Sequence, residues 1–231
     1  MPYSALELIN FSAWHQHQGP LIRGLNVKIN QGATIAFLSP YQYTRRLLID
    51  SLAGRHKLIR GSIRILNVET SHLDSHRLED VGMVLCDPHT GIVPHFNCEE
   101  NLLLPPGQAA LSGGGLPLGD IFRLFPQLEV HLTSLSSRLE PSLKYQLAWA
   151  RALRTGASIF LFDSFEQHLP AQDLPHLRTI LQWLNARNYT IILNEDSNSQ
   201  LQHLAGQIFN IETLNGASRL VAPQPPPHGL C

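Results

Sequence analysis

The chain has 231 residues, and its 17 lysine and arginine side chains against 18 aspartate and glutamate side chains give a formal net charge of −1. This length suits one large α/β domain with a substantial hydrophobic core. A nucleic-acid partner is not expected, because the chain has no excess of basic residues to hold a phosphate backbone. Charged residues make up only 15% of the chain, and so little charge predicts that a partner covers part of the surface.

Cysteine usage and hydropathy indicate where the chain works. Three cysteines form an odd and sparse set, which favours a reducing compartment and predicts neither a disulfide framework nor a metal site. The first residues do not read as a signal peptide, and no apolar run approaches the roughly 20 residues that span a bilayer. We therefore expect a cytoplasmic protein without direct membrane insertion, which partners could hold at the inner membrane.

Strands dominate the start of the chain. Three strands are predicted before the first helix, at residues 6–11, 24–29 and 33–38. The third is nearly all apolar, which is typical of a strand buried on both faces. A helix is predicted over 44–52, with Thr44 as its N-cap and Gly54 just beyond its end.

The rest of the chain alternates strands with helices. Strands are predicted at 62–68, 81–85, 158–162, 190–193 and 208–211, and helices at 143–153, 174–184 and 201–205. This alternation predicts a parallel sheet with helices on both faces, joined to a small antiparallel element formed by the strand-only N-terminus. From Ala222 the chain is rich in proline, which predicts a disordered tail over 222–231.

Several short segments, taken in order, resemble an ABC transporter ATPase. Residues 32–38 (GATIAFL) resemble the strand before the Walker A loop, and 99–102 (EENL) resemble the stretch after the Q-loop. Residues 124–128 (LFPQL) resemble the branched-chain amino-acid importer ATPases in particular. Residues 150–153 (ARAL) resemble the end of the signature helix, and 160–163 (FLFD) resemble Walker B.

The resemblance covers roughly residues 6–215, and between 125 and 163 the family pattern fits without a gap. It implies an α/β fold of the ABC-type P-loop NTPase class. Such a domain has a parallel RecA-like core sheet with helices, an N-terminal antiparallel β element and a helical subdomain. On this basis the domain would span residues 1–221, with the helical subdomain at about 96–157.

The family binds phosphate with a loop of the pattern G-x-x-G-x-G-K-[ST]. Its glycines let successive N–H groups wrap the phosphates, its lysine reaches the outer phosphates, and its Ser/Thr hydroxyl holds Mg²⁺. The equivalent residues 39–46 begin at Ser39 and read SPYQYTRR, without a single glycine. Pro40 also lacks an N–H group, and Tyr41 and Tyr43 would place rings where phosphate oxygens should lie.

Two arginines occupy the last two positions of this segment. Arg45 stands at the lysine position and keeps its charge with a different shape, whereas Arg46 stands at the magnesium-hydroxyl position and would repel a cation. One interpretation is that both bind some other anion at a helix N-terminus. The favoured interpretation is that they are solvated or pair with a carboxylate.

The other nucleotide-handling motifs are degenerate as well. Asp163 ends an apolar strand, as the magnesium-binding aspartate of Walker B would, although a residue there could equally cap the next segment. Ser164 stands where the family places its catalytic glutamate, and a serine cannot polarise the attacking water. Asp196 corresponds to the switch histidine, where it would oppose a γ-phosphate. The Q-loop equivalent, 86–88, has no glutamine, and the signature equivalent, 139–143, has no glycine.

Two surfaces of the family have candidate counterparts. Trp14 could stack on an adenine, although a lone tryptophan beside a strand more often belongs to a core or an interface. The residues Val93, Pro94, His95 and Phe96 lie where the family receives a helix of the membrane subunit. Their turn-rich, apolar character suits a docking groove, and ordinary loop burial is the alternative.

The joint loss of these motifs predicts a pseudo-ATPase with no catalytic residue and no cofactor. It would act as a structural or regulatory partner of a membrane permease, or pair as a heterodimer with a competent ABC ATPase. A first alternative is a divergent ABC ATPase that keeps residual binding of ATP and Mg²⁺ through Arg45, Asp163 and Trp14. A second is a soluble adaptor that uses the fold without touching a transporter.

Overall fold

The computed structural model describes residues 4–15, 19–57, 59–104, 114–214 and 217–224. In this part of the chain the strands form one ten-stranded sheet in the order β5-β4-β1-β2-β10-β9-β3-β8-β7-β6. The strands are β1 (Ser4–His15), β2 (Gly19–Asn30), β3 (Thr34–Leu38), β4 (Ile59–Ile65), β5 (Val68–Glu69), β6 (Met83–Leu85), β7 (Ile159–Asp163), β8 (Thr190–Glu195), β9 (Gln207–Leu214) and β10 (Ala217–Gln224).

The sheet combines a parallel and an antiparallel part. Strands β6, β7, β8, β3 and β9 pair in parallel, whereas β1 pairs antiparallel with both β2 and β4. Strand β10 joins the two parts, because it pairs antiparallel with β9 and parallel with β2. The predicted fold class, a parallel core sheet with an N-terminal antiparallel element, is confirmed.

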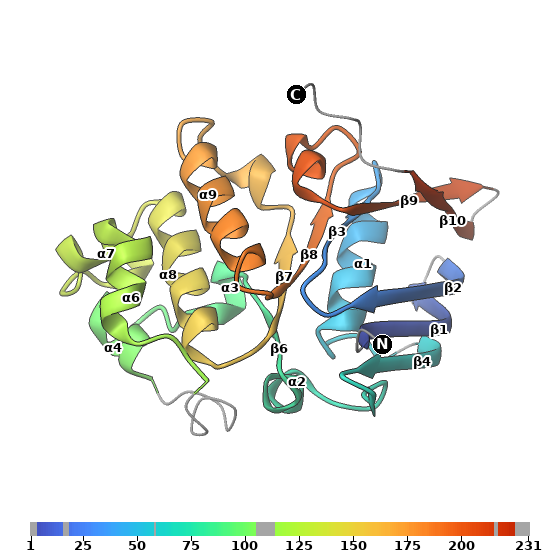
Figure 1. The fold of residues 1–231 in the computed structure, drawn as a ribbon, viewed down its shortest axis with the longest axis horizontal. Helices are drawn as coiled ribbons and strands as arrows, with labels where there is room; N and C mark the ends of the chain where they lie inside the picture. Colours follow the sequence, from blue (N-terminus) through green and yellow to red (C-terminus); the bar gives the residue numbers. More distant parts are fainter. Residues whose placement is uncertain (1–3, 16–18, 58, 105–113, 215–216, 225–231) are drawn as a thin grey trace.

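The helices lie mainly on one side of the molecule. They are α1 (Gln42–Leu52), α2 (Ser75–Val81), α3 (Pro88–Gly91), α4 (Cys98–Leu103), α6 (Leu118–Leu124), α7 (Pro126–Val130), α8 (Pro141–Arg154) and α9 (Leu174–Asn185), with short 3-10 turns η1 (Ser136–Arg138), η2 (Phe165–His168) and η3 (Gln200–Leu204). Figure 1 shows α4, α6, α7 and α8 gathered away from β1, β2 and β4. None of these helices is long and apolar enough to cross a membrane, within the described ranges.

Alternation along β3 divides the hydrophobic core into two layers. Ile35 and Phe37 belong to the layer that contains α1 and the antiparallel strands. Ala36 and Leu38 belong to the layer that contains α8 and α9. Successive side chains of a strand point to opposite faces. Strand β3 therefore contributes side chains to both layers, as expected of a strand buried on both faces.

Helix α8 is fixed to the end of β7 by aromatic packing. Trp149 is 1% exposed, and its ring centroid lies 4.5 Å from that of Phe162 and 5.0 Å from that of Phe165, both in edge contact. Such pairs stabilise beyond the area they bury. Through these ring contacts Phe165 and Phe162 connect the helical side of the molecule to the sheet.

Several elements differ from the sequence-based prediction. Helices α2, α3, α4, α6 and α7 had no individual prediction, the strand predicted at 62–68 is divided between β4 and β5, and the helix predicted at 201–205 is the 3-10 turn η3. Helix α1 begins at Gln42, with Tyr41 as its N-cap and no side-chain cap, so the prediction of Thr44 as N-cap is wrong. The N–H groups of Thr44 and Arg45 already donate to the Tyr41 carbonyl, which places Thr44 inside the first turn.

Strand β10 was not predicted, and it includes positions 222–224, where the tail was expected to begin. Its register with β9 shifts between Val221 and Gln224, around Pro223, which has no N–H group to donate to a neighbouring strand. The remaining residues of the predicted tail, 225–231, lie outside the described part of the chain.

Candidate functional site at the ends of the parallel strands

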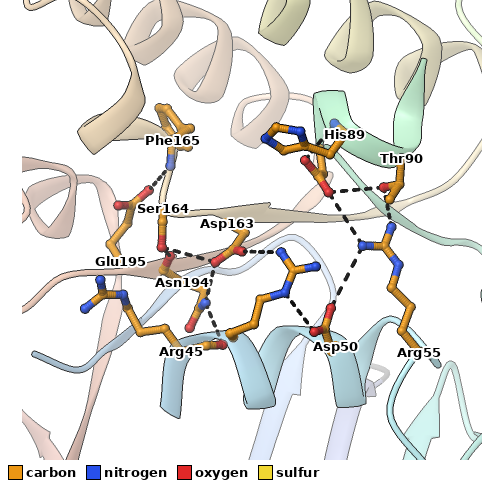
Figure 2. Close-up of polar contacts among 12 residues, drawn as sticks. Arg45, Asp50, Arg55, His89, Thr90, Asp163, Ser164, Phe165, Asn194 and Glu195 are labelled. Carbon is orange, nitrogen blue, oxygen red and sulfur yellow. Dashed lines mark hydrogen bonds and ion pairs between the residues drawn. The ribbon is translucent and has the colours of Figure 1, made fainter. Parts of the chain in front are cut away.

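The predicted site residues meet at the carboxyl ends of β3, β7 and β8. In open α/β sheets this edge is where ligands bind. The segment after β3 supplies Arg45 and Arg46, the end of β7 supplies Asp163, Ser164 follows it, and Asp196 follows β8. Figure 2 shows the polar contacts that join α1 to the ends of these strands. The structure therefore brings together the residues that sequence analysis singled out for three separate motifs.

The turn between β3 and α1 is only three residues long, from Ser39 to Tyr41. The N–H of Tyr41 donates to Ser39 Oγ at 3.3 Å, and the N–H groups of Thr44 and Arg45 both donate to the Tyr41 carbonyl at 3.1 Å. Pro40 has no N–H group. These backbone groups are therefore committed inside the chain, whereas a phosphate-binding loop aims such groups at its ligand.

Arg45 is turned inward. Its side chain is only 5% exposed, and its Nη1 lies 3.0 Å from Asp196 Oδ2. The same nitrogen also donates to the Ser39 carbonyl. The residue at the family's lysine position thus pairs with the residue at the family's switch-histidine position. Of the two states in the favoured interpretation, solvated or paired with a carboxylate, Arg45 is in the paired one.

Arg46 also pairs with carboxylates, although half of its side chain is exposed. Its Nε donates to Asp50 Oδ2 at 2.8 Å, and its Nη1 lies 3.8 Å from Asp163 Oδ2. At the position where the family places a magnesium-binding hydroxyl, a guanidinium thus contacts the aspartate that would share that metal. The positive charge beside Asp163 is therefore the Arg46 guanidinium group.

Asp163 connects β7 to β8. Its Oδ1 accepts hydrogen bonds from Asn194 Nδ2 at 2.7 Å and from Ser164 Oγ at 3.2 Å, and the same Asn194 nitrogen donates to the Arg45 carbonyl at 3.0 Å. The pKa of Asp163 is raised, because the effect of burial exceeds the lowering by the Asn194 and Ser164 hydrogen bonds and by the charge of Arg46. The Ser164 backbone is left-handed, with φ of 45°. Asp163 therefore does not cap the next segment, whose N-cap is Ser164 without a side-chain hydrogen bond. The contacts of Asp163 instead join the end of β7 to β8.

Glu195 is a buried carboxyl group that sequence analysis missed. It is 0% exposed, and its Oε1 accepts from the Phe165 N–H at 3.1 Å. Its Oε2 has no hydrogen-bond partner among the described residues. Burial, and then the charges of Glu166 and Asp163, raise the pKa of Glu195 to about 8. The only sequence signal was its place at the end of a buried strand.

Trp14 lies in β1, and its ring is already engaged. The Arg60 guanidinium carbon of β4 lies 5.2 Å from the ring centroid, within the range of a cation–π contact. One face of the ring is therefore covered by the chain itself. This contact supports the interpretation of Trp14 as a structural residue rather than a platform for adenine.

The predicted docking loop is anchored at one end and exposed at the other. Val93 is partly buried, and its N–H donates to Asn101 Oδ1 at 2.7 Å, while Asn101 Nδ2 donates back to the Val93 carbonyl at 3.1 Å. Pro94, His95 and Phe96 are exposed. The backbone of Val93 is therefore held in the loop by hydrogen bonds, whereas the three residues that follow form an accessible surface.

A pocket of about 410 Å³ opens beside this loop, between α2 and β6 on one side and α4 and α8 on the other. Gly91 and Asn101 line the pocket, and Asn101 is hydrogen-bonded to Val93 of the loop. Its wall combines apolar side chains with four charged ones, which are Arg55, Glu79, Arg151 and Arg154. Sequence analysis missed this pocket, because its lining comes from several segments that are distant along the chain.

Comparison of the sequence with known proteins shows remote similarity. No family model matches the sequence. The chain is 22% identical over 208 residues to the ribose import ATP-binding protein RbsA of Bacillus licheniformis, covering 87% of this chain and 40% of that protein. It is 22% identical over 196 residues to the sn-glycerol-3-phosphate import ATP-binding protein UgpC of Paraburkholderia xenovorans, covering 82% and 52%. The chain thus spans about half or less of the length of these curated relatives.

Comparison with solved structures shows the fold directly. An ATP-binding cassette of an ABC transporter, MJ1267 in its ADP conformation, matches with a TM-score of 0.76 at 16% identity, over 96% of this chain and 91% of that one. The dimeric ATP-binding cassette MJ0796, bound to ADP and Pi, matches with a TM-score of 0.78 at 15% identity, over 97% and 100%. The chain therefore has the fold of the ABC transporter ATPases. A particular kinship with branched-chain amino-acid importers stays a prediction.

Proposed function

We propose that this chain is a pseudo-ATPase built on the nucleotide-binding subunit of ABC transporters, and that it serves as a structural or regulatory partner of a membrane permease or of a competent ABC ATPase. The observation that carries the proposal is the turn from Ser39 to Tyr41. The N–H groups of Ser39, Tyr41, Thr44 and Arg45 are bonded within the chain. A triphosphate would have to break these bonds before it could be cradled.

Of the groups that P-loop proteins use for phosphoryl transfer, this chain keeps the aspartate at Asp163 and replaces the others, and the residues at these positions contact one another. Such proteins use a lysine on the phosphates, a hydroxyl and an aspartate on Mg²⁺, and a residue that orients the attacking water. Here Arg45 binds Asp196, Arg46 binds Asp50 and Asp163, and the Ser164 hydroxyl donates to Asp163. We accordingly assign no catalytic residue and no resident nucleotide or magnesium ion to this chain.

The docking surface that we propose is the pocket together with the exposed residues Pro94 to Phe96. An acidic or polar segment of a membrane permease would suit the pocket, because three arginines line it against one glutamate. The low fraction of charged residues, 15%, also suits a chain that works inside a complex. In this proposal the chain lies at the cytoplasmic face of the membrane through its partner.

Filling the pocket is expected to abolish co-purification with a membrane partner. Ser75 lines the pocket at the start of α2, so Ser75→Trp would place an indole in the space that the partner needs. The matched control is Arg77→Trp, an exposed position of the same helix that does not line the pocket. The measurement is purification from a detergent extract, with mass spectrometry of the captured membrane proteins.

The native chain and Arg77→Trp are expected to retain the same multispanning membrane protein, and Ser75→Trp is expected to lose it. Equal capture by both variants would contradict the pocket as the docking surface. Capture of no membrane protein by the native chain would instead favour a soluble adaptor. A competent ABC ATPase in the same eluate would support the heterodimer.

A further inference from the structure

Five alternating charged residues form a continuous row along α1. Asp163 Oδ2 lies 3.8 Å from Arg46 Nη1, and Arg46 Nε lies 2.8 Å from Asp50 Oδ2. Asp50 Oδ1 lies 4.0 Å from Arg55 Nη1, which lies 3.5 Å from Asp87 Oδ2. We call Asp163, Arg46, Asp50, Arg55 and Asp87 the carboxylate–arginine ladder. Its central part is visible in Figure 2, where Asp50 lies between two guanidinium groups.

The ladder joins three separate elements of the fold. Asp163 ends β7, Arg46 and Asp50 lie in α1, and Asp87 is the N-cap of α3. Arg55 follows α1 and also donates to the Thr90 hydroxyl. Asp87 in turn accepts from the His89 N–H at 3.0 Å and from the Thr90 hydroxyl at 3.1 Å. The position of α3 therefore depends on the ladder at both Asp87 and Thr90.

The ladder lies at the edge of the sheet where a ligand would otherwise join these elements. Bound ligands in open α/β sheets sit outside the carboxyl ends of the strands. A bound metal ion is often the largest local charge in such a site. Here two guanidinium groups supply the positive charge instead. The side chains of Asp163, Asp50, Arg55 and Asp87 are between 9% and 23% exposed, so solvent screens these contacts less than fully exposed pairs.

We propose that the carboxylate–arginine ladder takes the place of a bound nucleotide in setting the position of α3 against α1 and β7. The position of α3 is then set by side chains of the chain and needs no bound ligand. Arg55, Thr90 and Gly91 all line the pocket beside α3, so the ladder also keeps that pocket formed. A preformed surface lowers the ordering cost of binding a partner. The replacement of a nucleotide and the value for docking rest on the proposed function, whereas the role of the ladder in holding α3 does not.

Hydrogen–deuterium exchange of the full chain tests the ladder without any ligand. The variant Arg55→Gln keeps a polar side chain but removes the charge between Asp50 and Asp87. The amides of Thr90 and Gly91, which donate to the Asp87 carbonyl, are expected to exchange about tenfold faster, a factor that corresponds to ~1.4 kcal/mol. The amides of β3 are expected to exchange as in the native chain.

The matched control is Arg123→Gln, which removes an exposed arginine that pairs with Asp120 within α6. If Arg55→Gln does not fold, Asp87→Asn removes the same charge pair while its amide oxygen still accepts from the His89 N–H. The same acceleration is then expected. Exchange at residues 88–91 that matches the control in the folded variant would overturn the proposal. Binding of Mg-ATP by the native chain would overturn the proposed function and leave this result unaffected.

Discussion

Replacing Arg45 by methionine is expected to lower the free energy of unfolding by about 3 kcal/mol. Methionine fills most of the volume of the arginine stem. It leaves the Ser39 carbonyl without its donor and Asp196 without its counter-charge, at a site where the arginine side chain is only 5% exposed. Urea denaturation of the native chain and the variant measures this difference, since the midpoint shifts at a constant slope when only stability changes.

Arg46→Met is the matched control for this experiment. Arg46 is the next residue of the same helix and also pairs with carboxylates, but its side chain is 52% exposed. Exposed pairs of this kind contribute at most about 1 kcal/mol. Equal effects of the two substitutions would show that Arg45 is not an internal anchor. In that case the interpretation of both arginines as anion-binding groups would be favoured.

Replacing Glu195 by glutamine is expected to stabilise the protein most at about pH 8. The pKa of Glu195 is raised from 4.5 to about 8 in the folded chain, so folding takes up a proton between these two values. The stability of the native chain is then fully present below about pH 4.5. It falls as pH rises towards 8, by up to about 1.4 kcal/mol per pH unit.

Glutamine removes this loss, because it carries no ionisable group and its oxygen still accepts from the Phe165 N–H. Denaturation of both chains across this pH range measures the effect as the difference between the native chain and Glu195→Gln. The control is Glu99→Gln, at an exposed position of α4. A difference between native and Glu195→Gln that does not grow with pH would show that Glu195 is already ionised in the folded chain.

Local chemistry predicted most of the fold. The nearly all-apolar segment 33–38 predicted a strand buried on both faces, and the alternation of strands and helices predicted the parallel sheet. The start of α1 was missed because the N-cap rule favours Thr44, whereas the structure begins the helix on the carbonyl of Tyr41. Strand β10 was missed because prolines near its end indicate disorder locally, while pairing with β9 is a tertiary effect.

The candidate site was predictable only in part. Family positions identified Arg45, Arg46, Asp163 and Asp196, and sequence analysis favoured arginines that are solvated or pair with a carboxylate. Their actual partners depend on which segments the sheet brings together. Asp50 and Arg55 carried no motif. Asp50 obtains its role from its contacts with Arg46 and Arg55, and Arg55 from its contacts with Asp50 and with α3. No periodicity in the sequence encodes such contacts.

Residues at the nucleotide-binding positions of the ABC fold form ion pairs with one another in this chain. Arg45 contacts Asp196 and Arg46 contacts Asp163, so the positions of three motifs are joined by protein side chains. A buried arginine such as Arg45 is weak evidence for high stability, because desolvation opposes the attraction within its ion pair. Their value here is positional, since they hold strand ends and helix in one arrangement.

A thermal-shift titration with Mg-ATP tests the central claim most directly. A ligand that binds only the folded state raises the melting temperature, and at one hundred times its dissociation constant it stabilises by about 2.7 kcal/mol. For the native chain we expect no change in melting temperature with Mg-ATP at millimolar concentration. A saturable rise, absent in Arg45→Met, would show that the turn from Ser39 to Tyr41 opens to hold a triphosphate, and would contradict the account.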